Sequence, residues 1–204
     1  MVGVLKMSCL NRLRFVYVLA VAGLISLSSP AQAEQEAGPI GAKYTPEKIA
    51  ENVYVIHGPL GFPNSVNQGF MNNPVFLVTE EGVVLIDPGS SVQSGRMVLG
   101  EIAKVTDKPV VAVFATHIHG DHWLGNQAVL ESYPDADLYA HPNLIGEANA
   151  GQGAFWVDLM DQLTEGATRG TRVVAPDKPV EDGEQLSFGG NTVTVIHKGK
   201  AHTN

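Results

Sequence analysis

Four potential metal ligands lie within six consecutive residues of this chain. The stretch Thr-His-Ile-His-Gly-Asp-His-Trp, residues 116–123, follows a nearly continuous apolar run at 108–116. Such a run predicts a strand buried on both faces, and α/β folds collect functional groups at the ends of such strands. His117 and His119 are two positions apart, so at a strand end their side chains project to the same side. Two imidazoles in that arrangement can bind one metal ion.

The residues after this pair extend the cluster. Gly120 permits a sharp turn, and Asp121 and His122 after the turn can face a second ion close to the first. Without a metal, the four groups would gather polar side chains at a buried strand end, which carries a desolvation cost. We therefore expect His117, His119, Asp121 and His122 to bind metal.

The ligand types indicate which metal is held and what it would do. The only cysteine, Cys9, lies in the expected signal peptide, so histidine and carboxylate must hold the ion. This donor set suits Zn²⁺ best, with iron and manganese as alternatives. An ion with an open coordination position lowers the pKa of a bound water to ~7. Asp121 can orient or deprotonate that water, so we predict metal-assisted hydrolysis with Asp121 as a catalytic residue.

The N-terminal 33 residues read as an export signal. Three basic residues precede the apolar run Phe-Val-Tyr-Val-Leu-Ala-Val-Ala-Gly-Leu-Ile-Ser-Leu, and Ala31-Gln32-Ala33 follows as a small-residue cleavage site. The alternative is a transmembrane anchor, but the run is shorter than the roughly 20 residues that a spanning helix needs. We expect cleavage after Ala33, a periplasmic or secreted protein, and no stable membrane anchor after cleavage.

Charge narrows the range of partners. The chain has 13 basic and 21 acidic residues, a net charge of −8. Removing Lys6, Arg12 and Arg14 with the signal leaves ten basic residues against 21 acidic ones, and a net charge of −11. An acidic surface argues against binding nucleic acid through charge. We expect a small-molecule substrate, and the sequence leaves the oligomeric state open.

Several expected secondary-structure elements position the 116–123 cluster. Along the chain they are strands first, then alternating strands and helices, and finally a hairpin. Residues 34–49 form an expected flexible leader into a domain at 50–204. Composition and periodicity predict strands at 53–57, 75–79, 83–87, 108–116, 137–141, 185–188 and 191–197, and helices at 92–105, 123–133, 143–150 and 155–163. Long loops are predicted at 58–74, either functional or a simple hairpin excursion, and at 164–184. This order predicts a mixed α/β sandwich.

Three stretches resemble the metallo-β-lactamase superfamily. His-Ile-His-Gly-Asp-His resembles its H-x-H-x-D-H signature, Leu-Ile-Asp-Pro-Gly at 85–89 its strand-end aspartate, and Gly-Lys-Ala-His-Thr at 199–203 its G-x-x-H-T stretch. The resemblance covers roughly residues 50–204. It implies an αββα four-layer sandwich in which Asp87 is a supporting residue rather than a ligand.

The resemblance also implies which residues share an ion. His117, His119 and His202 would form one site, and Asp121 and His122 would begin a second, with two zinc ions in a complete centre. A bridging aspartate and a final histidine are expected downstream of Asn204. The chain is therefore expected to be a C-terminally truncated fragment whose second half is incomplete.

The sequence leaves alternatives for the function and for the roles of several other residues. A zinc hydrolase acting on a β-lactam, ester or thioester is the leading hypothesis. The alternatives are a mononuclear iron dioxygenase of the same fold, and a non-catalytic metal-binding accessory protein of a periplasmic quinoprotein or sulfur-oxidation system. We expect His57 and His197 to make ordinary hydrogen bonds and His141 to start a helix. Phe155 and Trp156 either line a substrate cleft or pack a helix.

Overall fold

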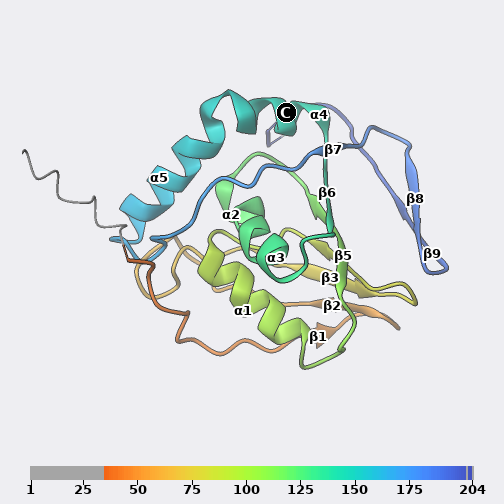
Figure 1. The fold of residues 1–204 in the computed structure, drawn as a ribbon, viewed down its shortest axis with the longest axis horizontal. Coiled ribbons are helices and arrows are strands. Elements are labelled where there is room, and N and C mark those ends of the chain that lie inside the picture. The colour runs from red at the N-terminus through yellow and green to blue at the C-terminus, as the bar shows by residue number, and fades with distance from the viewer. Residues whose placement is uncertain (1–34, 201, 204) are drawn as a thin grey trace, which may run out of the picture. The chain divides into compact units, whose positions relative to one another are not determined.

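A mixed sheet of seven strands organises the part of the chain that the computed structural model describes, residues 35–200 and 202–203 (Figure 1). Its strands, in spatial order, are β1 (Glu47–Lys48), β2 (Val53–Val55), β3 (Val75–Val78), β4 (Val83–Ile86), β5 (Val110–Ala115), β6 (Asp137–Ala140) and β7 (Lys178–Pro179). Pairing is antiparallel from β1 to β4 and parallel from β4 to β7. The predicted mixed α/β class is confirmed.

Some predicted features lie outside the described residues. The expected signal peptide and its cleavage site, residues 1–33, are among them, as is Ala201 in the G-x-x-H-T stretch. Within the described part, every helix is too short or too polar to cross a bilayer.

Helices connect the parallel strands, because parallel neighbours need a long crossover rather than a tight turn. Helix α1 (Val92–Ile102) joins β4 to β5, and two helices, α2 (Gly120–Trp123) and α3 (Asn126–Ser132), join β5 to β6. The helical segment between β6 and β7 consists of α4 (Pro142–Glu147), the π-helix η1 (Ala148–Gln152) and α5 (Gly153–Leu163).

Helix α1 begins where its sequence provides a cap. Ser91 Oγ accepts a hydrogen bond from the backbone N–H of Ser94 at 3.1 Å, and Ser94 Oγ accepts one from the backbone N–H of Ser91 at 2.8 Å. This reciprocal capping box satisfies two backbone donors at the helix start. The turn that carries Asp87 out of β4 therefore leads into a fixed helix.

The two faces of the sheet are covered differently. On one face, β4, β5 and β6 bury apolar side chains against α1 and α3, which lie side by side in Figure 1. On the other face, Val84 and Ala112 pack with Phe188 from the hairpin of β8 (Gln185–Phe188) and β9 (Asn191–Thr194). Alternate residues of β4 thus face opposite layers, as its pleat requires.

Several boundaries differ from the predicted ones. The helix expected at 123–133 is two helices, because Gly125 between them donates its N–H to the carbonyl of Gly89 at 2.9 Å. The helices expected at 143–150 and 155–163 adjoin through η1, where the non-helical backbone of Gly151, with a φ of 116°, makes a kink between them. The strand expected at 191–197 ends at Thr194, which is opposite the first residue of its partner β8.

Two short strands occur where none was predicted. β1 lies within the leader expected at 34–49, and β7 lies within the loop expected at 164–184. Each has two exposed residues, too few for an alternating apolar pattern. Both form by pairing with a longer neighbour, β2 or β6.

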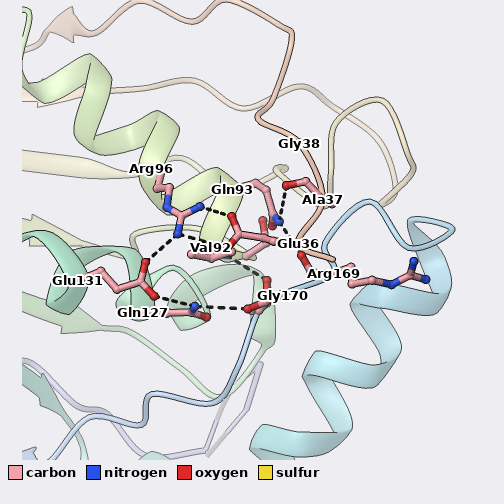
Figure 2. Close-up of polar contacts among 12 residues, drawn as sticks. Glu36, Ala37, Gly38, Val92, Gln93, Arg96, Gln127, Glu131, Arg169 and Gly170 are labelled. Carbon is pink, nitrogen blue, oxygen red and sulfur yellow. Dashed lines mark hydrogen bonds and ion pairs between the residues drawn. The ribbon is translucent and has the colours of Figure 1, made fainter. Parts of the chain in front are cut away.

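The segment that precedes β1 is bonded to helix α1 and to the 164–177 loop (Figure 2). Arg96 of α1 pairs with both Glu36 and Glu131, the latter at 2.8 Å from Nη2 to Oε2. The side-chain amide of Gln93 donates to the carbonyl of Arg169 at 2.8 Å, and the N–H of Ala37 donates to the same carbonyl at 3.0 Å. These contacts hold residues 36–37 against α1.

Candidate metal centre

Two parallel strands bring the predicted ligands to one edge of the sheet. Ile86 of β4 lies opposite Phe114 of β5, so the segments that follow both strands leave from the same edge. The first segment begins with Asp87. The second contains the stretch 116–123, in which α2 starts at Gly120. A Cβ on Gly120 would lie 2.8 Å from the Cβ of Trp156, so glycine permits the close approach of α2 to α5.

Three of the predicted ligands converge. His117, His119 and His202 each offer a ring nitrogen within 4.8 Å of the others. Nε2 of His202 lies 3.1 Å from Nδ1 of His119, although the residues are 83 positions apart. Two nitrogens that each bind a tetrahedral zinc at ~2.0–2.1 Å would be about 3.3 Å apart. The observed separation is close to that value.

Asp121 and His122 lie beside this group. The rings of His117 and His122 have centroids 4.0 Å apart. Nε2 of His122 is 3.2 Å from Oδ2 of Asp121, and Nδ1 of His122 is 2.7 Å from Oδ2 of Asp87. The structure therefore places all five predicted ligands in one neighbourhood, with the two expected sites adjoining at His117 and His122.

Both the side chain and the backbone of Asp87 are fixed by hydrogen bonds. Its Oδ1 accepts the backbone N–H of Thr116 at 2.8 Å, and its Oδ2 accepts the Thr116 hydroxyl at 2.7 Å. Its own backbone has a φ of +55°, a left-handed conformation that is uncommon outside glycine. The side-chain amide of Asn72 donates to its carbonyl at 2.8 Å. The strained backbone of Asp87 aims a buried carboxylate at His122.

Two histidines of the first group, His117 and His119, are held neutral. Burial, followed by the neighbouring charges of His122 and His119, lowers the pKa of His117 to about 4. Burial and the nearby His202 also lower the pKa of His119. Neutral imidazoles are the form that binds a metal ion.

Asp121 and His122, in contrast, are held in their charged forms. Burial alone would lower the pKa of His122, but hydrogen bonds to Asp121 and Asp87 outweigh it and raise that pKa to about 9. Burial alone would raise the pKa of Asp121, but the hydrogen bond and charge of His122 lower it. Without a metal, His122 is an imidazolium between two carboxylates.

One orphaned atom tests whether a metal fits here. Nε2 of His117 is buried and has no hydrogen-bond partner among the described residues, whereas buried polar atoms are almost always paired. Imidazole and carboxylate donors are a zinc-type set. The residues present therefore fit a zinc ion, with His117, His119 and His202 as one ligand set.

The remaining histidines lie elsewhere. Nε2 of His57 is 3.1 Å from Glu47 Oε2. The rings of His141 and His197 stack with centroids 3.9 Å apart, and His141 caps α4 by accepting the N–H of Asn143 at 3.2 Å. The prediction that His141 starts a helix is confirmed.

Trp156 has the helix-packing role, one of the two that the sequence left open, and it also lies beside the metal centre. It packs against the apolar cluster between α2 and α5, and its ring centroid is 5.0 Å from that of His119.

Thr116 was missed by the sequence reasoning. Its position directly before the first histidine was the available signal.

The sheet order and the convergence of histidines define a mixed α/β fold with a candidate metal centre. Residues 68–204 match the sequence model of the metallo-beta-lactamase superfamily. The match covers more than half of the chain, so the chain belongs to this superfamily.

Solved structures of lower identity share the fold. BJP-1, a subclass B3 metallo-beta-lactamase of Bradyrhizobium japonicum, is 21% identical and superposes with a TM-score of 0.58 over 80% of this chain and 55% of that one. The metallo-beta-lactamase GOB-18 from Elizabethkingia meningoseptica is 20% identical, with a TM-score of 0.56 over 80% and 54%. The predicted metallo-β-lactamase fold is confirmed.

Curated relatives match over shorter stretches. A linear primary-alkylsulfatase of Pseudomonas sp. is 46% identical over 69 residues, which are 32% of this chain and 13% of the relative. A hydroxyacylglutathione hydrolase of Francisella philomiragia is 33% identical over 76 residues, 37% of this chain and 28% of the relative. The chain thus aligns with less than a third of these relatives and with about half of the solved structures.

Proposed function

We propose that the chain carries the metal centre of a zinc-dependent hydrolase with a small-molecule substrate. The observations that support this most strongly are the convergence of His117, His119 and His202 and the buried Nε2 of His117, which has no partner among the described residues. Two zinc ions are proposed for the complete centre, with Asp121 and His122 contributing to the second site.

Each residue then has a defined task. A bound zinc ion would supply Lewis acidity and lower the pKa of a water to ~7. Asp121 is buried and ionised at neutral pH, so its carboxylate can orient that water and accept its proton. Asp87 holds His122 in place. Trp156 packs beside the ring of His119, with centroids 5.0 Å apart.

An ester-type bond is the substrate class we favour. Two curated relatives, at 46% and 33% identity, are named as an alkylsulfatase and a hydroxyacylglutathione hydrolase. The matched β-lactamases described above share the fold at about 20% identity. We therefore propose hydrolysis of a thioester or sulfate ester ahead of hydrolysis of a β-lactam.

Export completes the proposal. On the basis of the predicted signal at 1–33, we propose that the protein acts in the periplasm or outside the cell, after cleavage following Ala33 and without a stable membrane anchor. The acidic composition supports a small-molecule substrate rather than nucleic acid.

The test begins with metal content and then turns to substrates. The chain isolated from its source should contain zinc, and iron in its place would overturn the zinc assignment in favour of a dioxygenase-type centre. The zinc-loaded protein is then assayed with an alkyl sulfate, an acylglutathione and a chromogenic β-lactam. Turnover of an ester that is lost in His119→Ala supports the proposal. Turnover of the β-lactam alone contradicts the substrate class, and zinc binding without turnover of any of the three favours the accessory role.

A further inference from the structure

The hydroxyl of Thr116 lies between two residues of the metal centre. Oγ1 is 2.7 Å from Oδ2 of Asp87 and 3.0 Å from Nδ1 of His117. The backbone N–H of the same threonine donates to Oδ1 of Asp87 at 2.8 Å, which fixes the threonine against the carboxylate. Thr116 is thus bonded to Asp87 twice and to His117 once.

The direction of these bonds follows from the number of protons. A hydroxyl has one hydrogen to donate, and a carboxylate can only accept. The Thr116 hydrogen is therefore used in the bond to Asp87, which leaves an oxygen lone pair facing Nδ1 of His117. That bond can form only if Nδ1 of His117 carries the proton.

The other ring nitrogen is then determined. A neutral imidazole with its proton on Nδ1 has a lone pair on Nε2. In this structure Nε2 of His117 is the atom that is buried without a partner among the described residues. The hydrogen bonds of Thr116 thus leave a free lone pair on Nε2 of His117, the same atom that has no partner among the described residues.

We propose that Thr116 is a positioning residue that selects the Nδ1-protonated tautomer of His117 and so prepares Nε2 to bind metal. Asp87 then orients two ligands at once: His122 by a direct bond of 2.7 Å, and His117 through the Thr116 hydroxyl. The inference rests on the proposed metal site, and it explains why one carboxylate serves both halves of that site. Partners of this kind typically change metal affinity by about 10–100-fold when removed.

A matched pair of variants tests the proposal. Thr116→Val keeps the shape of the side chain and removes the hydroxyl, whereas Thr116→Ser keeps the hydroxyl. Thr116 is exposed, so both variants should fold. We expect Thr116→Val to bind zinc about 10–100-fold more weakly, and Thr116→Ser to stay within about threefold of the parent chain.

The tautomer itself provides a readout that does not depend on zinc. Long-range proton–nitrogen correlation spectra of the zinc-free chain, recorded in mildly alkaline buffer, should show His117 protonated on Nδ1. The same state is expected in Thr116→Ser, whereas Thr116→Val should show a population protonated on Nε2.

The results separate this inference from the proposed function. An Nε2-protonated His117 in the parent chain overturns the inference, whatever the zinc affinity. Unchanged tautomer and unchanged zinc affinity in Thr116→Val overturn it too. A parent chain with the expected tautomer that binds no zinc contradicts the proposed function and leaves the role of Thr116 supported.

Discussion

His117 and His122 have ring centroids 4.0 Å apart, yet their pKa values shift in opposite directions. Both are desolvated, and desolvation disfavours the charged imidazolium. The difference lies in their partners. His122 bonds directly to the carboxylates of Asp87 and Asp121, whereas His117 meets Asp87 only through the neutral hydroxyl of Thr116. One residue is therefore held charged and the other neutral.

This difference predicts how the metal-free chain responds to pH. The folded pKa of His122, about 9, lies above its ordinary value of 6.5. Its contribution to stability is therefore fully present below pH 6.5 and is lost as the pH rises through 9. The expected loss is at most about 3 kcal/mol. Thermal unfolding in the presence of a chelator, followed from pH 6 to 10, measures it.

Two variants check the origin of that loss. Asp87→Asn removes one carboxylate partner, so the pH dependence should weaken and move to lower pH. His57→Asn removes an exposed histidine that pairs with Glu47 outside the centre, and it should leave the dependence unchanged. Equal stability at pH 6.5 and pH 9 in the parent chain would contradict the charged state of His122.

At the scale of elements, small residues let the helices reach the turn that carries Asp87. A Cβ on Gly125 would lie 2.5 Å from the carbonyl oxygen of Pro88. That oxygen belongs to the backbone and cannot move aside as a flexible side chain can. The start of α3 and the end of β4 are thus packed backbone to backbone beside the metal centre.

Two glycine substitutions should therefore have opposite effects. Gly125→Ala forces the backbone at Pro88 to shift, and we expect it to destabilise the fold by about 1–3 kcal/mol. Gly100→Ala, inside α1 with no atom within 4 Å of the added carbon, should stabilise by about 0.5–1 kcal/mol through helix propensity. Urea unfolding of the three chains measures both. A neutral or stabilising Gly125→Ala would show that α3 can move away.

The elements differ in how well the sequence predicted them. The local sequences of β4, β5 and α1 are sufficient to predict them, because each is either a buried apolar run or a capped amphipathic helix. Their central residues agree with the prediction. β1 and β7 exist only through pairing with a neighbour, so local composition could not reveal them. Thr116 stands directly before the first histidine, but its role depends on Asp87, which is 29 positions away in sequence, so its position alone did not reveal that role.

The contacts of Arg96 provide a test of how the N-terminal segment is held. Arg96 is about half exposed, so its pairs with Glu36 and Glu131 should add less than about 1 kcal/mol to global stability. The local opening of the N-terminal segment can change even when the global free energy of unfolding does not. In Arg96→Met we expect faster hydrogen exchange at the amide of Ala37, which bonds to the carbonyl of Arg169. Lys104→Met, which loses only a pair with Glu101 on the same surface, is the control and should leave that amide unchanged.

At the scale of the whole described chain, the candidate metal centre brings together segments that are far apart in the sequence. His119 follows the central strand β5, whereas His202 lies beyond the β8–β9 hairpin. Between Thr194 and His202, the described contacts to other elements include a bond from the N–H of His197 to Asp182 at 2.9 Å and an ion pair from Lys198 to the same aspartate at 3.6 Å. A metal held by His119 and His202 would add a strong link between this segment and the sheet.

Zinc should therefore protect this segment from proteolysis. Trypsin cuts after Lys198 and Lys200, both exposed in the structure, and cleavage requires the segment to leave the metal centre. We expect saturating zinc to slow both cuts by about tenfold or more, because binding opposes opening in proportion to occupancy. Cleavage after Lys48, in the exposed strand β1, should be unaffected and serves as the internal control. In His202→Ala the two C-terminal cuts should be as fast with zinc as without it. If zinc leaves both cuts unchanged in the parent chain, His202 does not share an ion with His117 and His119.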